Sequence, residues 1–206
     1  MRTQLEGMVI LESGDHLTQP EFHRRYCKTP KAFRAELVEG IVYVSSPVRV
    51  IHGEPVAWVI GWLVAYIARH GGARIGNDAT VILDPDNEVQ PDAFLFREEQ
   101  GGPRVTDDNY IAGPPQLVVE VAVSSASYDL HEKLGAYRRN GVREYIVWRV
   151  RDSSIDWFRL EDAEYQRVEP DETGVIESSE FPGLRLNVAK MIAGDLPAVL
   201  AELNTD

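Results

Sequence analysis

The segment LVVEVAV, residues 117–123, carries one acid inside an otherwise apolar run. An isolated ionised carboxylate in a dry environment is so unfavourable that the group becomes neutral, pairs with a cation or binds a metal. The sequence therefore predicts a partner for Glu120. There are two candidates: Asp92, in the apolar segment QPDAFLF, and Lys133, in the helix expected after the Glu120 strand.

Asp92 and Glu120 have the right side chains to bind a divalent cation together. If their strands are neighbours in one sheet, the two carboxylates can point to the same face and converge on one ion. Oxygen ligands suit magnesium or manganese, and magnesium commonly binds through one or two carboxylates while keeping several waters. The two acids on neighbouring strands therefore predict a metal site.

Lys133 lies on the apolar side of its expected helix. Leu130, Lys133, Leu134 and Tyr137 follow the i, i+3, i+4, i+7 pattern of one helical face. The chain has only four lysines, and the others are Lys28, Lys31 and Lys190. If the site needs an ammonium group, Lys133 is the one available.

Simpler structural roles compete with this interpretation. Glu120 could form a buried ion pair with Lys133 or an arginine and take no part in catalysis. Asp92 could close a turn after Pro91, and Lys133 could form a surface pair with Asp129, four residues earlier on the helix. Because the two acids and the lysine occur together in this order, the combination favours a functional site.

The elements that must position these residues alternate between strands and helices, and they predict an α/β fold with a mixed β-sheet flanked by helices. A capping box at Thr18–Glu21 predicts a short helix to about Tyr26. The expected elements after it are two short strands in AELVEGIVYVSSP, a helix over His52–Arg69, a hairpin in TVILDPDNEVQPDAFLF, a loop over Arg97–Pro115, the Glu120 strand, a helix from Ser124–Ser127 to Asn140, two strands in EYIVWRV and SSIDWFRL, and a helix over Val188–Leu203 interrupted near Pro197.

Length and composition indicate one domain over residues 1–206. The net charge is −12, and residues 161–206 form an acidic C-terminal segment with 11 acids and 3 bases. Such a negative surface disfavours loose binding to phosphate backbones, although it leaves room for a local basic groove. One cysteine excludes an internal disulfide and clusters of thiolate zinc ligands, which fits a reducing cytoplasm.

No membrane segment is expected. The opening MRTQLEGMVILESGDHL mixes acids with apolar residues, unlike a secretory signal. The longest apolar stretch, PVAWVIGWLVAYIA, is shorter than the ~20 residues that a membrane span requires. Its apolar residues extend nearly all the way round, so we expect a buried helix that also offers a surface for a homodimer.

The order of PD, a strand acid and a lysine resembles the PD-(D/E)XK nuclease superfamily, which has the restriction-endonuclease-like fold. The chain resembles the Uma-two family of restriction endonuclease-like proteins more closely. The resemblance rests on AELVEGIVYVSSP, His52 opening a helix, the PD strand, GPPQLVVEVAVSS and DLHEKLGAYRRNGVREYIVW, and it covers Ala35 to Leu160. The superfamily places its lysine two residues after the acid, where this chain has Ala122, whereas the similar family uses the helix lysine, here Lys133.

This resemblance implies an active site. Asp92 and Glu120, with the Val121 backbone carbonyl, would hold Mg²⁺ or Mn²⁺, which lowers the pKa of a bound water. Lys133 would orient that water, and Glu36 would be a second-metal or outer-shell ligand. The nucleic-acid contacts would come from Arg138, Arg139, Arg143 and His52, although the arginines could equally be a solvated helix end and His52 a helix-start residue.

The expected function is that of a cytoplasmic, metal-dependent endonuclease that hydrolyses phosphodiester bonds in DNA, acting as a homodimer whose acidic tails turn away from a shared cleft. Two alternatives stay open: a catalytically inactive nuclease-fold scaffold that binds a protein partner, and an RNA or nucleotide phosphodiesterase.

Overall fold

The computed structural model describes residues 11–204. The expectation for the opening segment falls largely on residues 1–10, which lie outside this range. The helices are α1 (Gln19–Tyr26), α2 (Val50–His70), α3 (Ala126–Tyr128), α4 (Leu134–Asn140), α5 (Val188–Ile192) and α6 (Leu196–Glu202), with a π-helical turn η1 (Asp129–Lys133) and a 3₁₀ turn η2 (Val150–Asp152). The strands are β1 (Ala35–Val38), β2 (Ile41–Val44), β3 (Arg74–Gly76), β4 (Val81–Asp84), β5 (Asn87–Val89), β6 (Ala93–Phe96), β7 (Arg104–Val105), β8 (Ile111–Ala112), β9 (Leu117–Ala122), β10 (Glu144–Arg149), β11 (Ser154–Glu161), β12 (Glu164–Val168), β13 (Val175–Glu177) and β14 (Arg185–Asn187).

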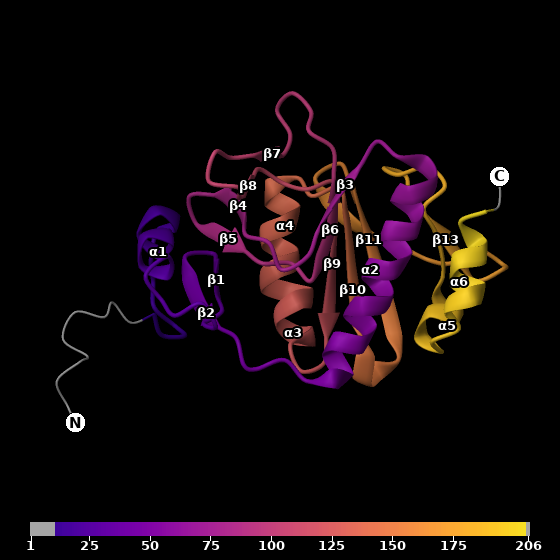
Figure 1. The fold of residues 1–206 in the computed structure, drawn as a ribbon, viewed down its shortest axis with the longest axis horizontal. Helices are drawn as coiled ribbons and strands as arrows, with labels where there is room; N and C mark the ends of the chain where they lie inside the picture. The colour runs from indigo at the N-terminus through magenta and orange to yellow at the C-terminus, as the bar shows by residue number, and fades with distance from the viewer. Residues whose placement is uncertain (1–10, 205–206) are drawn as a thin grey trace.

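Two six-stranded mixed sheets organise the molecule. The first has the order β2-β1-β5-β4-β8-β7 and the second the order β12-β11-β10-β9-β6-β3, while β13 and β14 form a small separate hairpin. The first sheet and α1 lie to one side of the second sheet, and α2 with the C-terminal helices lies to the other (Figure 1). The sequence-based prediction of a mixed α/β fold with flanking helices is confirmed.

The predicted central strand is β9, which lies between parallel β10 and antiparallel β6. Every residue of β9 is buried. Because side chains alternate along a strand, Leu117, Val119 and Val121 belong to one hydrophobic cluster with α2, and Val118 and Ala122 belong to another with α4. Glu120 therefore faces the side of the sheet that carries α4 and the first sheet.

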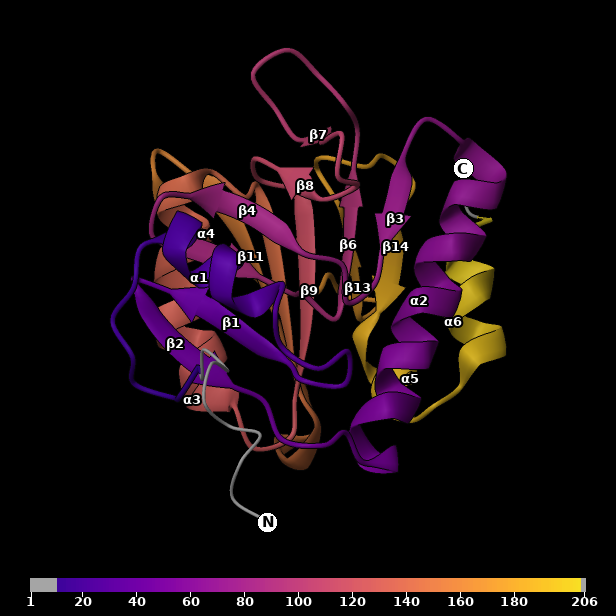
Figure 2. The same cartoon turned by 60° about the vertical axis from the view of Figure 1, so that its left-hand side comes forward.

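The two faces of the second sheet are covered by different elements. Helix α2 and the C-terminal helices cover one face (Figure 2). On this face Trp62 and Leu63 are fully buried. Ala136 and Tyr137 of α4 cover the other face together with buried residues of the first sheet. A polar group on this second face is enclosed between two sheets and a helix.

The long helix departs from one expectation. The apolar run was predicted to be too short to cross a membrane, but α2 continues beyond it at both ends and has 21 residues, so its length and apolar composition alone would allow a span. The buried side chains of α2 pack on the second sheet and the C-terminal helices. Such packing is typical of a core helix.

The predicted hairpin is confirmed at its DPDN turn, where β4 pairs antiparallel with β5, but its second strand ends sooner than predicted. The turn at residues 85–86 joins β4 to β5, and β6 leaves the first sheet to pair with β3 and β9 in the second sheet. The apolar segment QPDAFLF therefore crosses from one sheet to the other. This crossing carries Asp92 to the edge of β6, beside the Glu120 strand.

Two smaller details differ at helix ends. Helix α1 begins as predicted, with Pro20 in its first turn, but Thr18 makes no side-chain capping hydrogen bond. The predicted C-terminal helix breaks at residues 193–195, and α6 restarts with Asp195 accepting a hydrogen bond from the Ala198 amide and Pro197 in its first turn. The proline starts a helix because its missing N–H is not needed there.

Candidate active site

Asp92 lies directly before β6 and reaches the Glu120 strand. Ala93 pairs with Val119 across the antiparallel β6–β9 ladder, so one further step of the register places Asp92 opposite Glu120. Residues directly opposite in such a ladder share a face. Asp92 Oδ2 accepts a hydrogen bond from the Val121 amide at 2.7 Å, so this side chain binds the neighbouring strand and does not close its own turn.

Glu120 and Lys133 form a buried ion pair. Lys133 Nζ lies 2.9 Å from Glu120 Oε1, and the Tyr137 hydroxyl donates to the same oxygen at 2.8 Å. The π-helical turn η1 ends at Lys133 and places its side chain on the sheet-facing side. The predicted stripe is confirmed, since Lys133 and Tyr137 meet on Glu120.

Glu36 joins this pair from the other sheet. It lies on β1, and its Oε1 is 2.9 Å from Lys133 Nζ. The same oxygen accepts the Gln90 amide N–H at 2.7 Å. The exposed fractions of the Lys133, Glu120 and Glu36 side chains are 4%, 6% and 11%, so this triad is shielded from water.

His52 contacts the other acid. It lies in the first turn of α2, and its Nε2 is 3.3 Å from Asp92 Oδ1. The hydrogen bond to Asp92 raises the pKa of His52 above its ordinary value, although partial burial opposes the rise. His52 Nδ1 is buried without a hydrogen-bond partner. The sequence suggested a nucleic-acid contact for His52, and the structure places it against a candidate metal ligand.

The helical segment before Lys133 contributes the remaining side chains near the triad. Asp129 is buried and accepts a hydrogen bond from the Ser125 hydroxyl at 2.6 Å. The Tyr128 ring lies 5.5 Å from Lys133 Nζ, and the Tyr128 hydroxyl is buried without a partner. Lys133 bonds to Glu36 and Glu120 inside the protein, so the alternative of a surface pair with Asp129 is wrong.

Acidic side chains outnumber basic ones around this triad. Burial raises the pKa of Glu120 well above its ordinary value, and the nearby carboxylates of Asp92, Asp129 and Glu36 add to the rise while Lys133 opposes it. Burial alone would lower the pKa of Lys133, yet Glu120 and Glu36 hold it well above its usual range. Burial is the main cause of the first shift, whereas the acids around a single ammonium group cause the second.

This donor set fits a hard divalent cation. The acids supply carboxylate oxygens, and the surplus of negative charge would be relieved by an ion such as Mg²⁺ or Mn²⁺. Within residues 11–204, no group of three or more His, Cys, Asp or Glu side chains is already arranged as a metal site. Asp92 and Glu120 supply only two carboxylates, so an ion held by them would have to keep several of its waters. The Val121 carbonyl is the backbone oxygen next to Glu120 in the chain.

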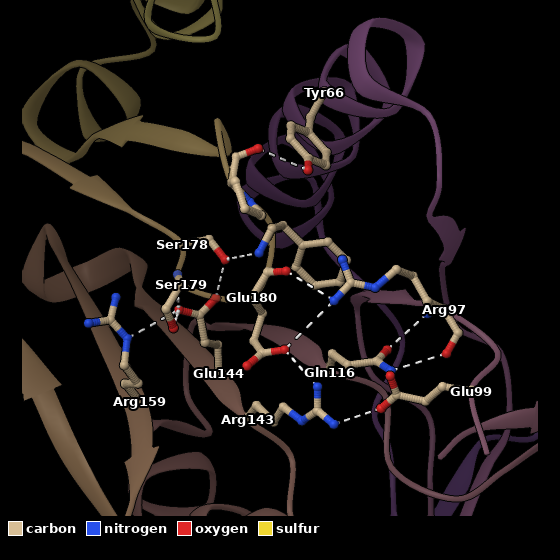
Figure 3. A network of polar contacts seen from close by, with 12 residues as sticks. Tyr66, Arg97, Glu99, Gln116, Arg143, Glu144, Arg159, Ser178, Ser179 and Glu180 are labelled. Atoms are coloured by element: carbon tan, nitrogen blue, oxygen red, sulfur yellow. Dashed lines mark hydrogen bonds and ion pairs between the residues drawn. The ribbon is translucent and has the colours of Figure 1, made fainter. Parts of the chain in front are cut away.

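The three predicted nucleic-acid arginines lie apart from this triad, and each is paired with an acid. Arg138 contacts Glu164, and Arg139 contacts Glu39. Figure 3 shows the third, Arg143, which binds Glu180 at 2.8 Å and Glu99 at 2.7 Å. Arg143 also lines a separate cavity of about 200 Å³. These pairs tie surface segments together.

Sequence reasoning did not assign a role to Tyr128, to Asp129 beyond a surface pair, or to Tyr137 beyond its helical stripe. The position of Tyr137, four residues after Lys133, was the available signal. The contribution of Tyr128 had no such signal, since the π-helical turn shifts the residue spacing by one.

The fold and the strand-borne acids beside a helix lysine define a restriction-endonuclease-like α/β protein. The crystal structure of a protein from Anabaena variabilis ATCC 29413, described as a "putative nuclease belonging to DUF820", is similar with a TM-score of 0.64 at 13% identity, covering 82% of this chain and 97% of that one. At this identity the similarity concerns the fold. A search of curated proteins finds no match.

A sequence model of the family Uma2, described as "Putative restriction endonuclease", matches residues 19–189. The match covers most of the chain, so the chain belongs to this family. The resemblance inferred from the motifs is confirmed, and the match extends beyond Ala35–Leu160 on both sides.

Proposed function

We propose that this protein is a metal-dependent endonuclease that hydrolyses phosphodiester bonds in DNA. The observation that carries the proposal is the position of Asp92 at the edge of β6, opposite Glu120 in the strand register and bonded to the next residue of β9, while Glu120 pairs with Lys133 of η1. Family membership supports nuclease chemistry. The metal, the DNA substrate and the roles of the residues are our proposal.

In this proposal Asp92 and Glu120 hold Mg²⁺ or Mn²⁺ together with the Val121 carbonyl. When bound, such an ion lowers the pKa of a coordinated water and stabilises negative charge on phosphoryl oxygens. Lys133 orients the attacking water and faces the phosphate. Glu36 acts from outside the ligand set, because its contact with Lys133 limits where the ammonium can lie.

The other side chains prepare the site. The Val121 amide fixes Asp92 Oδ2, and His52 contacts Asp92 Oδ1, so the Asp92 carboxylate is oriented from two sides. Tyr137 fixes Glu120 in the same way. Metal ligands that are oriented by neighbouring hydrogen bonds bind more tightly, and losing such a neighbour typically reduces metal affinity or activity about 10- to 100-fold.

A negatively charged protein must still bind DNA. Arg138, Arg139 and Arg143 are half-exposed and would contact phosphates by exchanging their present carboxylate partners. We further propose a cytoplasmic homodimer. Its surface is the side of α2 that does not pack on the sheet, where Val64 is 46% exposed beside the apolar hollow lined by Trp58.

The test is cleavage of supercoiled plasmid with Mg²⁺, Mn²⁺ or EDTA. The wild-type protein should nick or linearise the plasmid only with metal, and Asp92→Asn or Glu120→Gln should reduce the rate by more than about 100-fold, since even outer-shell changes reach that range. Glu144→Gln is the matched control, because Glu144 is also a buried acid of the second sheet but bonds to Ser178 and Ser179 outside the site.

Two results would contradict the proposal. Cleavage that survives Glu120→Gln at the wild-type rate would reject the site. An absence of cleavage with either metal would favour the inactive scaffold, for which the closed contacts of Lys133 with two glutamates are the supporting observation. Adding RNA or a nucleotide as competitor distinguishes DNA cleavage from the alternative of an RNA or nucleotide phosphodiesterase.

A further inference from the structure

Lys133 already occupies a cation position. Its Nζ lies 2.9 Å from Glu36 Oε1 and 2.9 Å from Glu120 Oε1, with the Tyr128 ring at 5.5 Å. A lysine ammonium is a compact point charge. Its surroundings here, carboxylate oxygens and an aromatic face among buried side chains, are those of a bound cation.

The proposed metal needs the same carboxylate. Glu120 Oε1 already accepts from Lys133 and from the Tyr137 hydroxyl. A divalent ion at this carboxylate would face the ammonium as a like charge in a buried space, where water and salt screen the repulsion weakly. Full contact of Glu120 with both cations is therefore disfavoured.

Glu36 offers the ammonium a place to remain. This carboxylate comes from the first sheet and is fixed by the Gln90 amide, so it does not depend on Glu120 for its position. The lysine side chain has four flexible carbons. A small change in its torsion angles can take Nζ away from Glu120 while it stays in contact with Glu36.

We propose that Lys133 competes with the metal: in the metal-free protein its ammonium occupies the cation position at Glu120, and a divalent ion that binds Asp92 and Glu120 displaces it towards Glu36. This inference rests on the proposed function, because it takes the metal site as given. It makes Lys133 a determinant of metal affinity, and it releases the ammonium for a substrate phosphate only after the metal has bound.

The test is calorimetric titration of Mn²⁺ into the wild-type protein, Lys133→Met and the control Lys190→Met, whose lysine is exposed and pairs with Asp195. All three titrations use the same buffer and pH, so that the proteins differ only in the substituted lysine. Removing one adjacent like charge should raise the affinity of Lys133→Met about tenfold or more, and Lys190→Met should bind as the wild type does. If Lys133 merely oriented water or braced the fold, its removal would leave the affinity unchanged or lower it.

Three outcomes of the Mn²⁺ titrations would overturn the competition, the proposed metal site, or both. If the wild type binds Mn²⁺ and Lys133→Met binds equally or more weakly, the competition is wrong while the proposed metal site stands. If neither protein binds Mn²⁺, the competition and the proposed function both fail. If Glu120→Gln binds Mn²⁺ as tightly as the wild type, the metal lies elsewhere and both ideas are again wrong.

Two further measurements test the competition if Lys133→Met does not fold. Lys133→Gln keeps two N–H donors without the charge, so it replaces Lys133→Met if that variant does not fold, with the same expected rise. In the wild type, side-chain ¹⁵N NMR at saturating Mg²⁺ should shift the Lys133 signal, while those of the exposed Lys28, Lys31 and Lys190 stay in place. An unchanged Lys133 signal would overturn the competition.

Discussion

Replacing Lys133 by methionine tests the charge balance of the pocket. Lys133 is the ammonium that two buried carboxylates share, and its own side chain is 4% exposed. Removing one partner of a buried ion pair leaves uncompensated charge and lowers the free energy of unfolding by about 3–5 kcal/mol. Because the ion pair is buried, solvent screening does not reduce this free-energy loss.

The same triad predicts a much smaller effect for Glu120→Gln. The glutamine Oε1 can still accept from Tyr137, and Lys133 keeps its contact with Glu36. Because the pocket has a surplus of acids, losing one of them removes repulsion as well as attraction. The expected loss is about 1 kcal/mol, the typical contribution of one hydrogen bond.

Calorimetric melting in EDTA measures both losses. For a chain of this size, 1 kcal/mol shifts the melting temperature by about 2–4 °C, so Lys133→Met should melt about 6–20 °C below the wild type and Glu120→Gln about 2–4 °C below. Lys190→Met, an exposed control, should stay within about 0.5 kcal/mol. Equal losses for Lys133→Met and Glu120→Gln would refute the surplus of negative charge.

Two further predictions concern neighbouring contacts. Because Asp92 raises the pKa of His52, their contact stabilises the fold fully below the unfolded-state pKa of histidine, and this stabilisation is lost as the pH rises through the raised value. Asp92→Asn should return the pKa of His52, measured by NMR titration, towards ~6.5. An unaltered titration of His52 would contradict the contact. A Cβ at Gly76 would lie 2.0 Å from Phe94 Cζ, so Gly76→Ala should lower the free energy of unfolding in urea by about 1–3 kcal/mol, and wild-type stability would show that the ring can move aside.

Hydrophobic patterning was sufficient to predict most elements of the fold. The unbroken apolar run of β9 indicated a strand buried on both faces, and that prediction is confirmed because β9 lies between two partners under covered faces. The predicted helix end at Asn140 is also confirmed, since the next residue, Gly141, adopts a left-handed conformation with φ 81° that glycine accepts readily.

The division into two sheets could not be read from the pattern. The segments of β5 and β6 follow one another with only Gln90, Pro91 and Asp92 between them, and nothing local states that one pairs with β4 and the other with β9. Partner choice among strands depends on contacts between distant parts of the chain. The hairpin at the DPDN turn is confirmed, and only the extension of its second strand into QPDAFLF was wrong, for this reason.

The candidate site was predictable in its charges but not in its contacts. An acid in an apolar strand requires a partner, and this physical necessity identified Lys133 in advance. The placement of Glu36 against Lys133 depends on how the first sheet packs on the second, which no spacing in the sequence encodes. The catalytic roles of these residues stay predictions.

The most direct test of the central claim is a crystal structure after a Mn²⁺ soak, with anomalous diffraction recorded at the manganese edge. An anomalous peak is expected within coordination distance of carboxylate oxygens of both Asp92 and Glu120, about 2.0–2.2 Å by analogy with other hard and borderline divalent ions. A fully soaked crystal with no peak between these two side chains, or with a peak elsewhere only, would contradict it.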